Sequence, residues 1–303
     1  MTVFDRRAVR RHRDRAAATL AQHDFLLREV GERLADRLDD VKRSFDRAFD
    51  LGCHGGELGR LLDGRGGIEL LVHADLSPAM VASASGAAVT CDEEALPFAP
   101  RSFDLVLSLL SLHWINDLPG ALVQVRQALN PDGLFLAAML GGETLKELRS
   151  SLAEAEMALE GRLSPRVSPF ADVRDAGDLM QRAGFALPVV DTETITVSYA
   201  DPFRLMADLR GMGETNAVIE RRRDGLRRAT LMAAAERYRA DFGDADGRVP
   251  ATFQVVYLTG WAPHRTQPKP LRPGSATARL ADALDTEEIS AGERATPGPS
   301  KSG

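Results

Sequence analysis

Short apolar runs alternate with helical patterns from about residue 45 to residue 140, and this alternation limits the fold more than any other feature of the sequence. The runs RAFDL, ELLVHAD, AVTC and GLFLAAML are too short for helices and have the length of buried strands. Strands that are joined by helices lie parallel in one sheet. The sequence therefore predicts an α/β fold with a doubly wound, mostly parallel sheet.

The chain divides into segments of different character. Apolar residues recur at helical spacing near the start, which predicts a helical segment over residues 1–44. The core domain is expected over 45–264. Within it, a helical insert at about 202–244 separates two late strands and is placed to cover a site as a lid. Residues 265–303 are rich in Pro, Ser, Gly, Ala and Thr and are expected to form a disordered tail.

Composition excludes several classes of protein. The 303 residues carry a formal net charge of -6, which argues against a general nucleic-acid-binding protein. No apolar run approaches the length of a membrane-spanning helix, and the N-terminus lacks the apolar core of a signal peptide. We expect a cytoplasmic protein. Two cysteines, Cys53 and Cys91, are too few for a disulfide framework or a cysteine metal cluster, and no metal site is expected.

Arginines are concentrated in residues 6–15. Acidic residues lie among them, so a solvated helix face outside the active site is the simpler interpretation. The alternative is weak peripheral contact with an anionic lipid or another anionic partner, which would place the protein at the inner face of the membrane.

A glycine-rich turn, DLGCHGGELG at residues 50–59, follows the first strand and begins a helix. It lacks the Gly-Lys-Ser/Thr ending of a phosphate-binding loop, and it matches a dinucleotide fingerprint at only one of three glycine positions. Asp50 at the strand end can bind an ammonium group, and Gly52 and Gly56 let the backbone approach a ligand. His54 stands between these glycines, and we expect it to be a tolerated departure.

Two more acidic residues follow the next two strands. Asp75 ends the second apolar run and can accept hydrogen bonds from ribose hydroxyls, whereas Asp92 can accept from the amino group of adenine. In a doubly wound sheet, the ligand lies outside the carboxyl ends of the strands, where these side chains converge. Each acid alone is also explained as a solvated loop residue or a helix cap. Together with Asp50 they indicate a nucleoside with an amino-acid tail.

The segments DLGCHGGELG, ADLSPAMV, DEEALPFAPRSFDLVLS and LNPDGLFLAA resemble the motifs of class I S-adenosylmethionine-dependent methyltransferases, over about residues 45–140. The resemblance implies a seven-stranded, Rossmann-like sheet and S-adenosylmethionine as the cofactor. The positions that match the family's cofactor-binding motifs are Asp50, Gly52, Cys53, Gly56, Asp75, Leu76, Asp92, Glu93 and Ser108.

A longer set of segments, including SLLSLHWINDLPGAL, MLGGETLKELR and LMADLRGMGETNA, resembles the family of the fifth assembly factor of respiratory complex I and its bacterial relatives. The mitochondrial members of that family are associated with hydroxylation of an arginine in the quinone-site, iron-sulfur-bearing subunit. SLHWINDLP and LNPDG are also similar to the malonyl-carrier-protein methyltransferases of biotin synthesis. The chain leaves no room for a transit peptide, so a bacterial cytoplasmic relative is expected.

Three residues are the candidates for chemistry. His113 lies just beyond a strand and can face the substrate, although packing beside the next helix explains it equally well. Glu143 is a candidate acid, base or guanidinium partner, or else a helix-start acid. Asp208 belongs to a polar cluster in the insert, together with Arg210, Glu214 and Asn216. The cluster is either part of a lid over the site or a solvated helix end.

The leading hypothesis is an enzyme with the methyltransferase fold that modifies an arginine of a complex I subunit during assembly. One alternative is an S-adenosylmethionine-dependent methyltransferase that acts on a small molecule or an acyl-carrier protein. Another is a cofactor-binding assembly chaperone without catalysis. Hydroxylation needs an oxidant, and oxygenase iron sites typically use two histidines and a carboxylate. We expect no iron site in this sequence.

Overall fold

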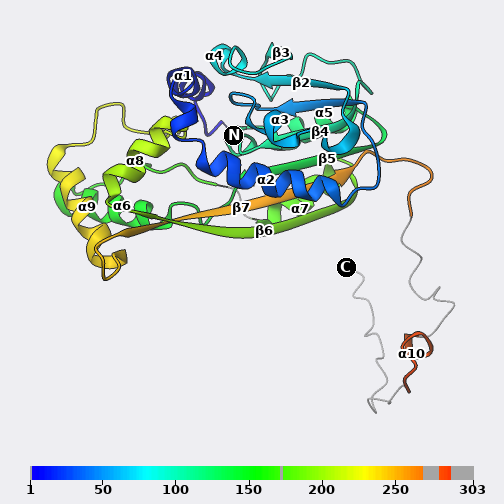
Figure 1. Cartoon of the computed structure of the whole chain (residues 1–303). Helices are drawn as coiled ribbons and strands as arrows, with labels where there is room; N and C mark the ends of the chain where they lie inside the picture. The colour runs from blue at the N-terminus through cyan, green and yellow to red at the C-terminus, as the bar shows by residue number, and fades with distance from the viewer. Residues whose placement is uncertain (1, 171–172, 269–279, 288–303) are drawn as a thin grey trace, which may run out of the picture. The chain divides into compact units, whose positions relative to one another are not determined.

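The computed structural model describes residues 2–170, 173–268 and 280–287. Its larger compact unit, Met1–His264, contains one seven-stranded sheet in the order β3-β2-β1-β4-β5-β7-β6 (Figure 1). β1 to β5 are parallel, while β7 runs antiparallel to both β5 and β6. The doubly wound, mostly parallel, seven-stranded sheet is therefore confirmed. The strands are β1 (Arg47–Leu51), β2 (Leu70–Asp75), β3 (Ala87–Thr90), β4 (Phe103–Leu109), β5 (Leu129–Leu140), β6 (Ala186–Tyr199) and β7 (Val249–Trp261).

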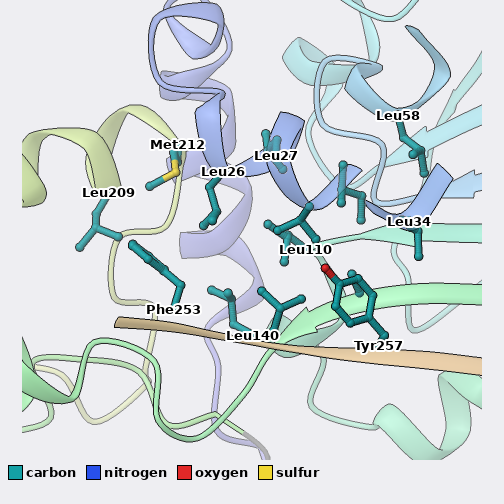
Figure 2. Close-up of a cluster of buried hydrophobic side chains, with 14 of the residues drawn as sticks. Leu26, Leu27, Leu34, Leu58, Leu110, Leu140, Leu209, Met212, Phe253 and Tyr257 are labelled. Atoms are coloured by element: carbon teal, nitrogen blue, oxygen red, sulfur yellow. The ribbon is translucent and has the colours of Figure 1, made fainter. Parts of the chain in front are cut away.

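Helices cover both faces of the sheet, because alternate side chains of the central strands point to opposite sides. On one face, Leu107 and Phe253 pack in a core with α2 (Phe25–Asp39) and α3 (Glu57–Leu62), part of which is drawn in Figure 2. On the other face, Val106 packs with α5 (Leu118–Ala128) and α7 (Val173–Arg182). The sheet is thus packed between two buried cores, one on each face.

The N-terminal segment forms two helices with a break between them. α1 (Arg6–Ala16) is capped by Asp5, whose side chain accepts a hydrogen bond from the backbone of Ala8, and a 3-10 turn (Leu20–Gln22) precedes α2. A third cluster of buried residues joins α1 to the body of the domain through Phe4, Val9 and Trp114. α1 is therefore a packed element of the domain.

The insert expected at about 202–244 contains two helices, α8 (Pro202–Gly211) and α9 (Arg228–Phe242), with an irregular stretch between them. α9 packs against α6 (Lys146–Glu160), and α8 contacts α1. The short helix α4 (Pro78–Val81) follows β2 and also contacts α1. This arrangement brings the N-terminal helix and the insert together.

The predicted disordered tail, residues 265–303, lies mostly outside the described residues, among which α10 (Leu280–Ala283) is a single turn of helix. Within the part of the chain that is described, none of the helices combines the length and the apolar composition needed to cross a membrane.

Candidate functional site

The strand order reverses between β1 and β4, and the carboxyl ends of the parallel strands form an edge at this point. Asp50, fully buried near the end of β1, has its Oδ2 3.0 Å from Nδ1 of His73 on β2. Its other carboxylate oxygen, Oδ1, is buried without a hydrogen-bond partner. A buried, unsatisfied carboxylate oxygen is costly, so it suits an ammonium group of a ligand.

The glycine turn leaves no room for side chains where two of its glycines stand. Gly52 has φ +71°, and a Cβ built there would lie 2.0 Å from Oγ of Ser111. Gly56 has φ +83° at the start of α3. His54 is buried with φ +49°, and its Nε2 lies 3.0 Å from the carbonyl oxygen of Leu109. The backbone conformation thus requires glycine at the two outer positions. The imidazole of His54 is held by its contact with the carbonyl of Leu109.

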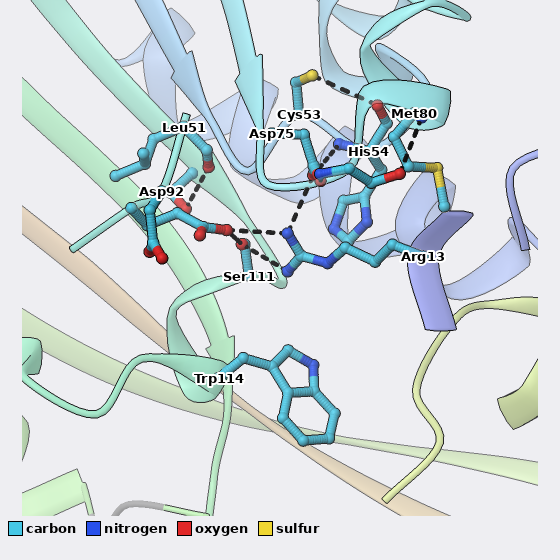
Figure 3. A network of polar contacts seen from close by, with 12 residues as sticks. Arg13, Leu51, Cys53, His54, Asp75, Met80, Asp92, Ser111 and Trp114 are labelled. Atoms are coloured by element: carbon cyan, nitrogen blue, oxygen red, sulfur yellow. Dashed lines mark hydrogen bonds and ion pairs between the residues drawn. The ribbon is translucent and has the colours of Figure 1, made fainter. Parts of the chain in front are cut away.

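Arg13 of α1 inserts its guanidinium between Asp75, at the end of β2, and Glu93, after β3 (Figure 3). Its Nη1 donates to Oδ2 of Asp75 at 3.0 Å and to Oε1 of Glu93 at 2.8 Å. Its Nη2 donates to Oγ of Ser111 at 2.8 Å. The side chain of Arg13 is only 1% exposed. Burial lowers the pKa of its guanidinium, but the charges of Asp75 and Glu93 outweigh burial and raise the pKa above its ordinary value.

Arg6, also on α1, donates to Oδ1 of Asp92 at 2.7 Å and to Oε2 of Glu93. Burial by itself raises the pKa of Glu93, but the charges of Arg13 and Arg6 outweigh it and bring the pKa to about 2. Arg6 and Arg13 thus contact the acids predicted to bind the cofactor, whereas a solvated helix face apart from them was expected for residues 6–15. The reason is that the acidic edge of the sheet and the inner face of α1 have complementary charge.

Four further residues matched family motifs. Cys53 is buried, and desolvation together with the charge of Asp50 raises the pKa of its thiol. Ser108 donates its hydroxyl hydrogen to the carbonyl of Leu51 at 2.8 Å, inside the sheet. Leu76 packs against the cluster that anchors α1. Gly56, like Gly52, shapes the turn. Their roles toward a cofactor stay predictions.

Three of the buried side chains offer ligand atoms within 4.8 Å of one another, namely Asp50, Cys53 and His73. Asp50 and His73 already bond each other, and the set holds one histidine, whereas oxygenase iron sites typically use two histidines and a carboxylate. We therefore assign no metal to it. The same Asp50, with the glycine turn and the two acids beyond β2 and β3, fits the amino-acid end and the nucleoside end of S-adenosylmethionine, provided that Arg13 leaves.

A cavity of about 280 Å³ lies between the carboxyl end of β5, α6 and the insert. Trp114, Glu214 and the arginines Arg166 and Arg210 contribute its polar lining. Its apolar wall includes Leu140, Leu145, Leu148, Phe170, Met206 and Leu209. Apolar walls around a few polar groups are typical of a substrate pocket.

Glu214 is the carboxylate of this cavity. Its Oε2 accepts a hydrogen bond from Nε2 of His113 at 3.0 Å, and both oxygens lie 3.1 Å from Nε1 of Trp114. Because the backbone N–H of Leu140 points at Nδ1 of His113, the ring proton is on Nε2. Burial raises the pKa of Glu214, but its contacts with His113 and Trp114 and the charge of Arg13 lower it more, so that Glu214 is ionised.

The three predicted catalytic residues do not come together. His113 is fully buried behind Glu214, and so it positions this carboxylate. Glu143 is exposed beyond β5, is paired with Lys146, and is not part of the cavity lining. Asp208 lies 2.8 Å from Nδ1 of His23 between α8 and the end of the 3-10 turn, also outside the lining.

Sequence reasoning assigned no role in the site to Arg13, Arg6 or Ser111. One signal for Arg13 was present, because Val9, Arg13 and Ala16 share one face of the helix at four- and three-residue spacing. An arginine on an apolar helix face needs a buried partner. For Ser111 the sequence holds no comparable signal.

Comparison with known proteins agrees with this geometry. Residues 49–137 match a family described as a methyltransferase domain. The chain is 46% identical to "Arginine-hydroxylase NDUFAF5, mitochondrial" of Danio rerio, over 93% of this chain and 89% of that protein. It is 40% identical to "Malonyl-[acyl-carrier protein] O-methyltransferase" of Halorhodospira halophila, over 85% of this chain and 88% of that protein.

Among solved structures, a phosphoethanolamine N-methyltransferase of Haemonchus contortus shares the fold, with a TM-score of 0.53 and 16% identity. The match covers 84% of this chain and 60% of that one. Because the Danio rerio protein is nearly half identical along almost its full length, this chain belongs to the NDUFAF5 family of enzymes with the fold of S-adenosylmethionine-dependent methyltransferases.

Proposed function

We propose that this chain binds S-adenosylmethionine and modifies an arginine side chain of a respiratory complex I subunit, the quinone-site subunit that carries an iron-sulfur cluster, during assembly. The observation that carries the proposal is the ionised Glu214 at the end of an apolar cavity. An arginine side chain combines an apolar stem with a guanidinium, which is best held by a carboxylate. The name of the Danio rerio relative, an arginine-hydroxylase, supports the same substrate class.

The position of the cavity relative to the cofactor site supports this substrate pocket. A second, very small cavity of about 10 Å³ is lined by His54 of the glycine turn and by Glu214, Leu140 and Met212. Glu214 and Leu140 also line the larger cavity. A guanidinium bound at Glu214 would therefore lie near the glycine turn, which is predicted to hold the methionine end of the cofactor, and such proximity favours reaction.

Glu214 retains acceptor capacity for a substrate. A carboxylate offers about four lone-pair sites, and the N–H groups of Trp114 and His113 occupy only some of them. The two rings also fix the direction of the carboxylate, since both donate hydrogen bonds to it. When bound, S-adenosylmethionine supplies an electrophilic methyl group; hydroxylation of arginine would require a separate oxidant.

The test uses cells with and without this gene, complemented with the wild type or with Glu214→Gln. We expect the quinone-site iron-sulfur subunit to carry an added oxygen atom or methyl group on one arginine in cells with the wild-type gene, and to lack it in cells without the gene. Glu214→Gln should lower the rate of modification by about 10- to 100-fold, because hydrogen bonds to charged groups contribute about 1.5–3 kcal/mol.

The matched control is Glu220→Gln, which removes the same charge from an exposed position of the insert. Modification should be unchanged in this variant. Mass spectrometry of the digested subunit reads the result, and the identity of the added atoms distinguishes hydroxylation from methylation. Identical arginine masses with and without the gene would refute the proposal.

A second candidate function is methylation of the free carboxylate of a malonyl carrier protein. The observation that favours it is Arg210, which is exposed and lines the same cavity, because an arginine binds a carboxylate well. The Halorhodospira halophila relative bears the corresponding name. In an assay with malonyl carrier protein, Arg210→Gln would abolish methyl transfer if this function holds, whereas the arginine-modifying function predicts no transfer by the wild type.

A further inference from the structure

We infer that Arg13 is an internal ligand of the cofactor site and that α1 is the gate which must open before the nucleoside of the cofactor can bind. The inference rests on the proposed cofactor. Arg13 contacts Asp75 and Glu93, two of the residues predicted to hold the nucleoside. Its guanidinium therefore lies where ribose hydroxyls would have to reach the same carboxylates.

The acceptor atoms of Asp75 are already engaged. Oδ2 accepts from Arg13 and from the backbone N–H of His54 at 3.1 Å, and Oδ1 accepts from the backbone N–H of Ser77 at 2.8 Å. A pair of ribose hydroxyls needs two acceptor positions on this carboxylate. Departure of Arg13 frees one acceptor position on Oδ2, whereas the contacts from the backbone of His54 in the glycine turn and of Ser77 at the start of α4 stay.

Glu93 is occupied in the same way. Its Oε1 accepts from Arg13 and from Oγ of Ser111 at 2.9 Å, and its Oε2 accepts from Arg6. Glu93 and Arg13 are both almost completely buried. Two arginines of α1 thus neutralise most of the charge of the three acids Asp75, Asp92 and Glu93.

This charge balance explains why the exchange is possible. A carboxylate left unpaired in a buried site is strongly destabilising, so Arg13 leaves only when another positive or hydrogen-bonding group replaces it. S-adenosylmethionine brings a sulfonium, an ammonium and the donating ribose hydroxyls. The freed guanidinium regains its hydration at the same time.

Opening must involve α1 as a whole, because its backbone is packed. A Cβ placed on Gly213 would lie only 3.5 Å from Cα of Arg13. Nδ1 of His12 bonds the carbonyl of Thr215 at 2.9 Å, and Phe4 packs edge-on against Trp114 with ring centroids 5.3 Å apart. The first two contacts join α1 to the residues on either side of Glu214, and Trp114 donates a hydrogen bond to Glu214 itself. The gate therefore couples cofactor binding to the substrate pocket.

Hydrogen exchange of the wild-type chain, with and without S-adenosylhomocysteine, tests the gate without any substitution. We expect the ligand to increase the exchange of backbone amides in residues 6–16, because the anchoring contacts of Arg13 are broken. The amides of β4 serve as the internal reference and should not change, since they lie in the sheet. Unchanged or slower exchange in residues 6–16 on ligand binding would overturn the inference.

Calorimetric titration with the same ligand tests the competition directly. Arg13→Gln should bind S-adenosylhomocysteine about tenfold or more tightly than the wild type. In the wild type, the fraction of molecules with a free site is lowered by Arg13, and the variant lacks this competitor. The control Arg11→Gln changes an exposed arginine of the same helix and should bind like the wild type. Circular dichroism verifies that each variant is folded.

The outcomes separate this inference from the proposed function. If the wild type and Arg13→Gln bind S-adenosylhomocysteine equally, the gate is refuted and the cofactor assignment stands. If the folded variants and the wild type all fail to bind it, the cofactor assignment falls, and the gate falls with it.

Discussion

His54 adopts a left-handed backbone conformation inside the glycine turn, with φ +49°. Such a conformation costs a residue with a side chain roughly 1–2 kcal/mol. The contact of its Nε2 with the carbonyl of Leu109 offsets part of this cost, since a hydrogen bond contributes about 1 kcal/mol. The nitrogen Nδ1 stays buried without a partner. The imidazole is therefore energetically close to neutral for the turn.

We predict that His54→Gly leaves the free energy of unfolding within about 1 kcal/mol of the wild type, because relief of strain and loss of the hydrogen bond are of similar size. Binding of S-adenosylhomocysteine should also be kept, since the backbone N–H that donates to Asp75 is present in glycine. Urea unfolding and calorimetry measure the two quantities. A more than tenfold loss of affinity would instead identify the imidazole as a ligand contact.

At the scale of secondary-structure elements, β7 ties the second half of the chain to the first. It runs antiparallel between β5 and β6, and its Phe253 and Tyr257 enter the same core as α2 (Figure 2). β6, by contrast, is an edge strand with exposed residues such as Val189. The cavity is bordered by the carboxyl end of β5, so its shape depends on this packing.

Phe253→Ala should lower the free energy of unfolding by about 3–5 kcal/mol, the usual cost of removing a fully buried phenylalanine and leaving a cavity. Val189→Ala, at a side chain that is 56% exposed on β6, should cost less than about 1 kcal/mol. Chemical denaturation of both variants gives the comparison. Equal losses would show that β7 does not contribute more to the core than the edge strand.

For the whole molecule, the junction between α1 and the insert makes stability depend on pH. Burial and the charge of Arg15 both disfavour the protonated ring of His12 and lower its pKa to about 4, from an ordinary value of 6.5. Between pH 6.5 and pH 4 the unfolded chain binds a proton at this ring that the folded chain does not bind. The stability that the neutral ring of His12 contributes to the folded chain is thus fully present above pH 6.5 and is lost as the pH falls toward 4.

We therefore expect the wild type to lose more stability than His12→Gln when the pH is lowered from 7.5 to 5. The window stays above the range where buried carboxylates such as Glu93, with a pKa of about 2, begin to titrate. Urea midpoints at the two pH values measure the difference. If the two proteins lose stability equally, His12 does not link protonation to the junction.

Much of the molecule could be predicted from local patterns. The apolar runs of four to eight residues and the helical spacing between them determine a parallel sheet, because side-chain periodicity reflects which faces are buried. The acids Asp50, Asp75 and Asp92 could be placed at one edge for the same reason, since parallel strands end on the same side. These features depend on residues close together in the chain.

Which residues contact these acids was decided only by the tertiary structure. Arg13 lies 62 residues before Asp75, and the contact of His113 with Glu214 spans 101 residues. No periodicity records such pairs, because they depend on how α1 and the insert pack over the finished sheet. The sequence by itself determined the sheet, the glycine turn and the family motifs. The folded chain determined that Arg13 contacts the acids predicted to hold the nucleoside and that Glu214 faces the cavity.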